Sequence, residues 1–201
     1  MGTVSPDDRA GQRYRSMGPS SSIAFPPGDV YNEWWISIGT GTMIGANVSM
    51  AVGIPGEHLD RGADPVITIG ARCSIGRGSF IIGRVGIDIG DDITIAPNVY
   101  ITDHNHGYAD VTMPIKRQYP VHAPVRIGSG SWLATGAKVL PGADIGRNVV
   151  VAAGAVVRGV VPDFSVVAGS PARVVRQYTD GEGWVPPITY EDETPAGWPP
   201  D

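Results

Sequence analysis

Residues 125–157 have the sequence VRIGSGSWLATGAKVLPGADIGRNVVVAAGAVV, and an aliphatic residue recurs at every sixth position of this stretch. In most repeats the next residue is small, and so is the residue four positions later. The aliphatic positions are Ile127, Leu133, Val139, Ile145, Val151 and Val157. A period of six fits neither an α-helix nor a single alternating strand. It favours a column of coils with three flat faces, in which each six-residue unit supplies one strand and one turn.

The same repeat continues towards the N-terminus, with one shift of phase by two residues. Its earlier positions are Ile38, Ile44 and Met50, then Ile69, Ile75, Ile81 and Ile87, then Ile89, Ile95 and Ile101. We therefore expect an all-β chain, a parallel β-helix whose coils stack about 4.8 Å apart. The predicted solenoid spans residues 30–176. An irregular segment, residues 1–29, precedes it, and an acidic, proline-rich tail, residues 177–201, follows it.

Two segments interrupt the period, residues 53–65 and the longer loop 103–124. The longer loop carries three of the four histidines, His104, His106 and His122. A regular solenoid has no structural need for such an extrusion, and long ordered loops are frequent carriers of function. We therefore expect the loop 103–124 to project from the column and to hold part of a functional site.

The composition sets limits on location and partners. A net charge of −5 offers no polycationic face, so nucleic acid is not an expected partner. Residues 1–22 are polar and do not resemble a secretory leader. The longest apolar stretch, residues 149–157, is too short to span a bilayer. The single cysteine, Cys73, is compatible with a reducing compartment. The expectation is a cytoplasmic protein without a membrane span.

Four segments carry a family resemblance: IGDDITIAPNVYITDHNHGYADVTMPI, PVRIGSGSWLATGAKVLPGADIG, VVVAAGAVV and SVVAGSPARVVR, all within residues 89–176. In this order they resemble the hexapeptide-repeat acyltransferases, in the branch of the maltose, galactoside and polysaccharide O-acetyltransferases. The resemblance implies a left-handed β-helix and a homotrimer with active sites between neighbouring subunits. It also implies acetyl-CoA or another acyl-CoA as donor, and a hydroxyl of a sugar, glycan or small natural product as acceptor. No metal is expected.

Acyl transfer to a hydroxyl needs a base, and histidine suits that role near neutral pH. Matched without a gap, the family's catalytic histidine falls on His106, whereas a gap in the loop places it on His104. In an extended segment the two side chains point to the same side, so both remain candidates. The neighbouring Asp103 could orient an imidazole or could form a turn.

The resemblance also implies a set of residues that bind acyl-CoA. Trp132 corresponds to a tryptophan near the thioester or the acceptor end of the cleft, although packing between subunits would equally explain a large ring there. The small residues Thr135, Gly136, Ala153 and Gly154 leave room for a pantetheine arm, but the repeat itself also requires small residues. Arg173 and Arg176 match a basic pair near the 3′-phosphate of CoA, which guanidinium groups bind well. Without a ligand they would form a charged end-cap.

Two other functions fit parts of the pattern. One is a trimeric scaffold without catalytic activity, because the family's acceptor-binding Asn and Asp fall near Gly76 and Arg84 in this chain. The other is a zinc enzyme similar to γ-class carbonic anhydrases, which would need three converging histidines and an open fourth position. The histidine spacing fits that site poorly. The acceptor, the acyl chain and the choice between oxygen and nitrogen remain open.

Overall fold

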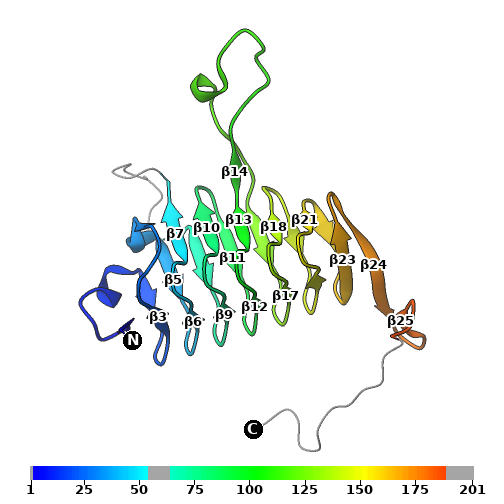
Figure 1. Ribbon diagram of the computed structural model, residues 1–201, viewed down its shortest axis with the longest axis horizontal. Coiled ribbons are helices and arrows are strands. Elements are labelled where there is room, and N and C mark those ends of the chain that lie inside the picture. The colour runs from blue at the N-terminus through cyan, green and yellow to red at the C-terminus, as the bar shows by residue number, and fades with distance from the viewer. Residues whose placement is uncertain (1, 54–63, 189–201) are drawn as a thin grey trace, which may run out of the picture.

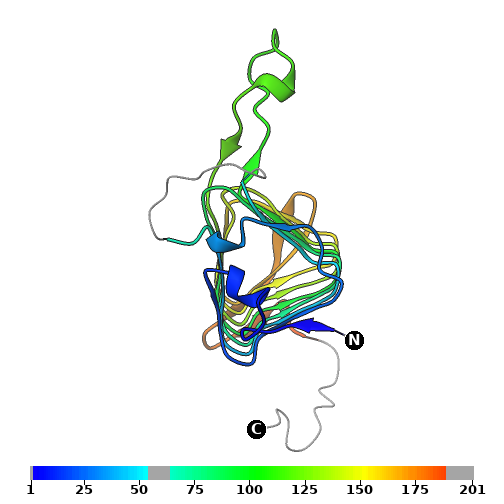
Figure 2. The same ribbon diagram turned by 90° about the vertical axis from the view of Figure 1, so that its left-hand side faces the viewer.

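The computed structural model describes residues 2–53 and 64–188, which form a three-sided column of short strands (Figures 1 and 2). Strands of successive coils lie above one another and pair in parallel, so each side of the column is one sheet. Among these residues, helix is limited to three short 3-10 turns: η1 (Gly11–Arg13), η2 (Glu33–Trp35) and η3 (Ile115–Arg117). None of them is long and apolar enough to cross a membrane. The all-β prediction is confirmed.

We name the sides faces I, II and III, in the order in which each coil visits them. Face I contains β2 (Ser16–Met17), β5 (Ile36–Ile38), β8 (Ile67–Ile69), β11 (Ile87–Ile89), β16 (Val125–Ile127), β19 (Asp144–Ile145) and β22 (Val160–Val161). Face II contains β1 (Thr3–Val4), β3 (Ser22–Ala24), β6 (Met43–Ile44), β9 (Ser74–Ile75), β12 (Thr94–Ile95), β17 (Trp132–Leu133), β20 (Val150–Val151), β23 (Ser165–Gly169), β24 (Ala172–Thr179) and β25 (Gly183–Val185). Face III contains β4 (Val30–Tyr31), β7 (Ser49–Val52), β10 (Phe80–Gly83), β13 (Tyr100–Thr102), β18 (Lys138–Val139) and β21 (Val156–Val157).

The aliphatic repeat fills the inside of the column, as predicted. Every aliphatic position named above is at most 2 % exposed. The strand register aligns the repeats, so that Ile95 pairs with Ile75 of one neighbouring coil and with Leu133 of the other. Burying one such side chain contributes about 1.5–3 kcal/mol. In β11 both Ile87 and Ile89 point inward while Asp88 between them is exposed, which explains the two-residue shift of phase.

The N-terminal end of the column begins upstream of residue 30, the boundary predicted from the sequence. β2 and β3 already pair in parallel with β5 and β6 and form two sides of a first coil. β1 then runs antiparallel to β3, and the half-open end is filled by Tyr14, which is 7 % exposed. The repeat was not recognisable here because only Met17 and Ile23 keep its six-residue spacing.

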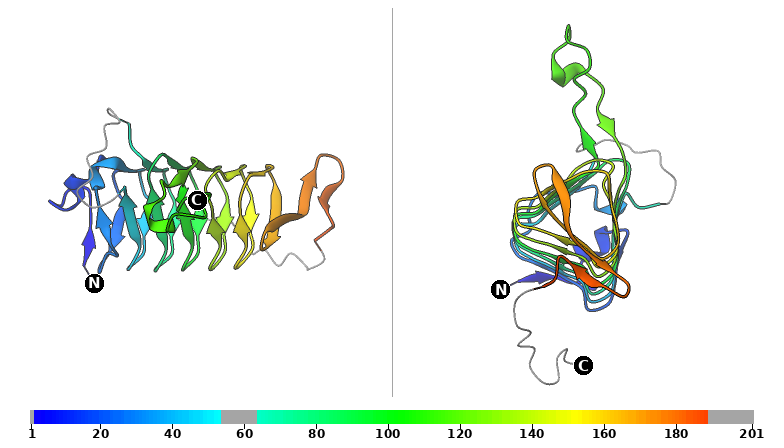
Figure 3. Two further views of the ribbon diagram at one scale, coloured as in Figure 1. Left: turned by 90° about the horizontal axis from the view of Figure 1, so that it is seen from above. Right: turned by 90° about the vertical axis from the view of Figure 1, so that its right-hand side faces the viewer.

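The C-terminal end is covered by strands that reverse direction. β24 returns antiparallel to β23, and β25 returns antiparallel to β24. Figure 3 (right) shows this segment, in orange and red, over the C-terminal end of the column. β24 extends to Thr179, so it crosses the predicted boundary at residue 176. Residues 189–201 of the predicted tail lie outside the described residues.

The loop 103–124 projects from the column as an arm, as expected (Figures 1 and 2). Its root is a two-stranded antiparallel ribbon, β14 (His104–Asn105) with β15 (Val121–His122). The arm leaves the column after β13 on face III and returns into β16 on face I, so it marks the corner between these faces. Its outer part is apolar and exposed, with Val111 96 % and Tyr108 76 % accessible. Such a surface indicates a contact with another molecule.

Candidate active site

The root of the arm holds a buried carboxylate against an imidazole. Asp103 is 0 % exposed, and its Oδ1 lies 2.9 Å from Nδ1 of His104. Its Oδ2 accepts hydrogen bonds from three consecutive backbone amides, those of Arg84 (2.8 Å), Val85 (2.6 Å) and Gly86 (2.7 Å). These amides belong to the corner of the preceding coil, directly after β10. The carboxylate is therefore fixed in position, and it orients the histidine next to it.

The charge of Asp103 determines which nitrogen of His104 is free. Burial by itself raises the pKa of this carboxyl. The hydrogen bonds from His104 and from the three amides outweigh burial, so the pKa lies below its ordinary value. An ionised carboxylate only accepts hydrogen bonds, so Nδ1 of His104 carries the proton and Nε2 is the basic atom. With its side chain 26 % exposed, His104 can present Nε2 to a ligand.

The two other histidines of the arm differ from His104. His106 is exposed and makes no hydrogen bond or ion pair within the described part of the chain. His122 pairs in register with His104 across the ribbon, and its ring packs edge-on against Tyr119, with 5.9 Å between centroids. Its Nδ1 is buried without a hydrogen-bond partner among the described residues. Only His104 therefore combines partial exposure with an orienting carboxylate.

The predicted acyl-CoA residues of the middle coils lie on another side of the column. Trp132 is 48 % exposed on the outside of face II. Thr135, Gly136, Ala153 and Gly154 stack in two successive coils at the corner between faces II and III, where the amide of Gly154 donates to the carbonyl of Thr135 at 3.0 Å. Gly136 and Gly154 have φ of 72° and 68°, a backbone conformation that suits glycine. The side chain of Lys138 also lies at this corner, where its Nζ donates a hydrogen bond to the carbonyl of Gly136 at 3.1 Å.

The predicted phosphate-binding arginines lie at the C-terminal end. Both are on β24, where Arg173 is opposite Ala168 and Arg176 is opposite Val166 of β23. Arg173 is exposed, and its Nη1 donates to the carbonyl of Ala172 at 2.9 Å. A single chain thus separates the predicted residues into four places: the arm, the outside of face II, the corner between faces II and III, and β24.

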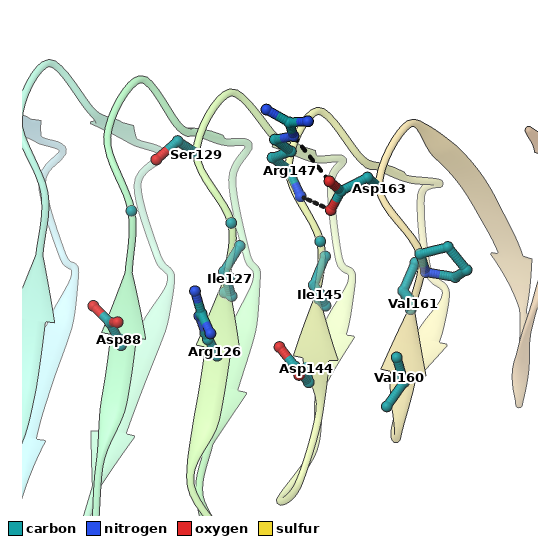
Figure 4. Close-up of a pocket in the computed structure, with 14 residues that line it drawn as sticks. Asp88, Arg126, Ile127, Ser129, Asp144, Ile145, Arg147, Val160, Val161 and Asp163 are labelled. Atoms are coloured by element: carbon teal, nitrogen blue, oxygen red, sulfur yellow. Dashed lines mark hydrogen bonds and ion pairs between the residues drawn. The ribbon is translucent and has the colours of Figure 1, made fainter. Parts of the chain in front are cut away.

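Face I carries a groove that the sequence pattern did not indicate. A hollow of about 390 Å³ lies next to the arm root, between Gly86 and Pro124 on one side and Thr68 on the other. A second hollow of about 630 Å³ continues across β16, β19 and β22 (Figure 4). Both are lined by Asp88, Arg126 and Asp144. These outward positions alternate with the buried repeat, which carries no information about their neighbours.

In the described residues, no group of three or more His, Cys, Asp or Glu side chains is arranged to hold a metal ion. His104 and His122 are register partners across the ribbon, but no third such side chain joins them in the described part of the chain. An imidazole that a buried carboxylate orients, as at the arm root, is an arrangement that can take up and release a proton.

Comparison with known families agrees with the fold. Residues 124–159 match the model of the bacterial transferase hexapeptide (six repeats), and residues 35–55 and 66–103 match the hexapeptide repeat of succinyl-transferase. A protein of Escherichia coli named as a lipopolysaccharide biosynthesis O-acetyl transferase, WbbJ, is 35% identical over 141 residues, which are 67% of this chain and 70% of that protein. The chain belongs to the hexapeptide-repeat acyltransferase family.

Two further likenesses concern length and architecture. A Mycobacterium tuberculosis protein named as an acetyltransferase is 36% identical over 148 residues, 70% of this chain, but the match spans only 49% of that relative. The structure of AntD, an N-acyltransferase from Bacillus cereus solved with dTDP and coenzyme A, superposes with a TM-score of 0.73 at 19% identity, covering 89% of this chain and 91% of that one. The family and the left-handed β-helix fold predicted from the sequence are confirmed.

Proposed function

We propose that this chain is an acyl-CoA-dependent O-acetyltransferase in which His104, oriented by Asp103, is the general base. The observation that carries the proposal is the contact of 2.9 Å between Nδ1 of His104 and the buried Asp103 at the root of the arm. The family relationship supports acyl transfer, and the CoA bound to AntD supports a thioester donor.

The chemistry follows from the free nitrogen of His104. Nε2 takes the proton from the acceptor hydroxyl, and the oxygen forms a bond to the carbonyl carbon of the thioester. The carbon–sulfur bond then breaks, and the imidazolium of His104 returns the proton to the leaving sulfur. Asp103 stabilises the imidazolium while it carries the positive charge. The products are an ester and free CoA, and the histidine is again neutral.

The separation of the site residues supports a trimer in which neighbouring chains complete each site. The arm root lies at the corner between faces III and I, whereas Gly136 and Gly154 lie at the corner between faces II and III. In a threefold arrangement, the corner between faces III and I of one copy can meet the corner between faces II and III of the next copy. Face III of every copy then points inwards. Faces I and II then face outwards, and the apolar arm lies over Trp132 of the adjacent copy.

The outer surface of face III supports this arrangement, because it carries two large exposed aromatic rings. Phe80 and Tyr100 are 44 % and 38 % exposed on adjacent coils, with ring centroids 6.3 Å apart. Tyr100 continues in register to Lys138 and then to Val156 of the following coils. In the proposed trimer these aromatic rings are buried at the centre.

Replacing Phe80 by glutamate is expected to convert the trimer into monomers, because three carboxylates would then meet without partners at the centre of the assembly. Light scattering coupled to size exclusion measures the mass directly. The matched control is Val160→Glu on face I, where the side chain is 79 % exposed and the trimer is expected to persist. A native protein that is already a monomer at micromolar concentration contradicts the arrangement.

Binding of acetyl-CoA tests the donor. A ligand that binds only the folded protein raises its melting temperature, so millimolar acetyl-CoA is expected to stabilise the native chain. Absence of this shift, together with absence of acetyl transfer, contradicts the proposed function.

The double substitution Arg173→Ala with Arg176→Ala is expected to weaken CoA binding by about tenfold or more, because guanidinium groups make strong charge-assisted contacts to phosphate. 3′-Dephospho-CoA, which lacks the 3′-phosphate, should bind the double variant and the native protein with equal affinity. Arg9→Ala is the control, since Arg9 is exposed at the opposite end of the column. If the double variant binds CoA as the native protein does, these arginines do not contact the donor.

A further inference from the structure

We propose that the groove on face I binds the acceptor and that the acceptor is an extended oligosaccharide without a large net charge. This inference rests on the proposed function, because it assigns the acceptor of the same site.

The groove is continuous and begins at the arm root. Its two hollows share Asp88, Arg126 and Asp144, so they form one trough and not two sites. At one end the lining includes Gly86, whose amide also holds the carboxylate of Asp103. At the other end the trough reaches Val160 and Asp163 in the last coil. A chain-like ligand lying in the trough would therefore have one end beside the proposed base.

The floor of the trough is a row of three charged side chains on successive coils. Asp88 is in register with Arg126, and Arg126 is in register with Asp144. All three are exposed and point to the same side of the sheet (Figure 4). None of the three side chains makes a hydrogen bond or ion pair within the described residues, although opposite charges follow one another along the row.

Opposite charges on neighbouring coils of the same face do form an ion pair elsewhere, between Arg147 and Asp163. Nε of Arg147 lies 2.8 Å from a carboxylate oxygen of Asp163 at the rim of the same trough. This pair closes the edge of the groove, whereas the three side chains of the floor remain available to a ligand.

The chemistry of the row selects hydroxyl groups. Carboxylates only accept hydrogen bonds and a guanidinium group only donates them, so the row alternates acceptor, donor and acceptor. A hydroxyl can do both, and a sugar presents several hydroxyls in fixed positions. The alternating signs disfavour a polyanion as well as a polycation. Pro65 and Pro124 in the hollow at the arm root offer apolar surface to the C–H faces of a sugar ring.

The length of the trough indicates more than one sugar unit. It runs from β8 to β22 across five adjacent strands of face I. Four steps of strand spacing correspond to about 19 Å. A monosaccharide would occupy only the part next to the arm root, so affinity is expected to increase with the length of the oligosaccharide.

The experiment uses the full chain on an array of defined neutral and acidic oligosaccharides, from mono- to hexasaccharides. Native protein is expected to bind neutral glycans of three or more units. Arg126→Ala and Asp144→Asn are each expected to lower that binding by about tenfold, because each removes hydrogen bonds to a charged group. Arg72→Ala is the control, since Arg72 is exposed on the same column, paired with Asp92 and outside the trough.

Three outcomes overturn the proposal: no binding to any glycan on the array, equal binding by native protein and Arg126→Ala, or preference for polyanionic glycans. Dissociation of the trimer by Arg126→Glu would also overturn it, because the trough would then be an interface between copies. Acetyl-CoA stabilisation of the same preparations separates the two proposals. Glycan binding without acetyl-CoA binding contradicts the proposed function but not the assignment of the groove to a glycan. Acetyl-CoA binding without glycan binding contradicts only the assignment of the groove.

Discussion

Replacing His104 by glutamine is expected to lower kcat for acetyl transfer by about a hundredfold or more, the usual cost of losing a general base. Glutamine retains a polar side chain at the arm root but has no basic nitrogen to take the hydroxyl proton. The carboxylate of Asp103 loses the hydrogen bond from Nδ1 but keeps those from the three backbone amides, so the melting temperature should fall less than in a variant that removes the carboxylate, and the affinity for acetyl-CoA should change little. Initial rates of CoA release, measured with saturating donor and acceptor, give kcat directly.

His106→Gln is the matched control for this prediction. His106 lies two residues after His104, directly beyond the end of β14, but it is exposed and has no orienting carboxylate in the described structure. We expect its replacement to change kcat by no more than a few fold. A hundredfold loss in His106→Gln with normal turnover in His104→Gln would assign the general base to His106. Normal turnover in both variants would mean that neither histidine is the general base.

The fold could be predicted from the sequence because the six-residue aliphatic repeat that specifies it is local in the sequence. Outside the two interruptions, each inward aliphatic residue is followed within six residues by the next one, so the column can be recognised without knowing which coils are in contact. The aliphatic repeat is sparse in the first coil, where only Met17 and Ile23 keep the spacing. The sequence therefore does not predict that this coil belongs to the column. The arm was also visible, since it is a gap in an otherwise regular period.

The arrangement of the site was less predictable, because it depends on contacts between coils. The sequence left His104 and His106 as alternatives, and it left Asp103 as either an orienting group or a turn former. The feature that distinguishes them is the set of amides at Arg84, Val85 and Gly86, which lie 17 to 19 residues before Asp103. A backbone amide has no sequence signature. Only the stacking of β13 on β10 brings this corner to the carboxylate.

The groove on face I was hidden for a similar reason. Asp88 and Arg126 are register partners across the insertion of the whole arm, so their separation in sequence bears no relation to the repeat. Taken one at a time, exposed Asp and Arg residues on a β-helix are ordinary surface residues. Their alignment in a row of alternating charge becomes apparent only with the strand register.

Asp103→Asn is expected to destabilise the folded chain by about 2–3 kcal/mol. The carboxylate is a buried anion that accepts several hydrogen bonds, whereas the NH2 group of asparagine would lie opposite N–H groups that also donate. For a chain of this size the loss corresponds to a fall of roughly 5–10 °C in melting temperature. A second effect is expected on kcat, since the amide no longer stabilises the imidazolium of His104. Asp110→Asn is the control: its carboxylate is on the exposed arm and, among the described residues, accepts hydrogen bonds only from Thr112, so the melting temperature should stay nearly constant.

The dependence on pH gives an independent test of the same carboxylate. Its pKa in the folded chain is lower than in the unfolded chain, so the unfolded state binds more protons as the pH falls. The stability that Asp103 contributes is therefore complete well above pH 4, and it is lost as the pH falls through the lowered folded value. The difference in melting temperature between native protein and Asp103→Asn should be largest near neutral pH and should shrink below about pH 4. A difference that stays constant between pH 7 and pH 3 would mean that the carboxylate at the arm root is not held as an anion, and the orientation of His104 would then need another cause.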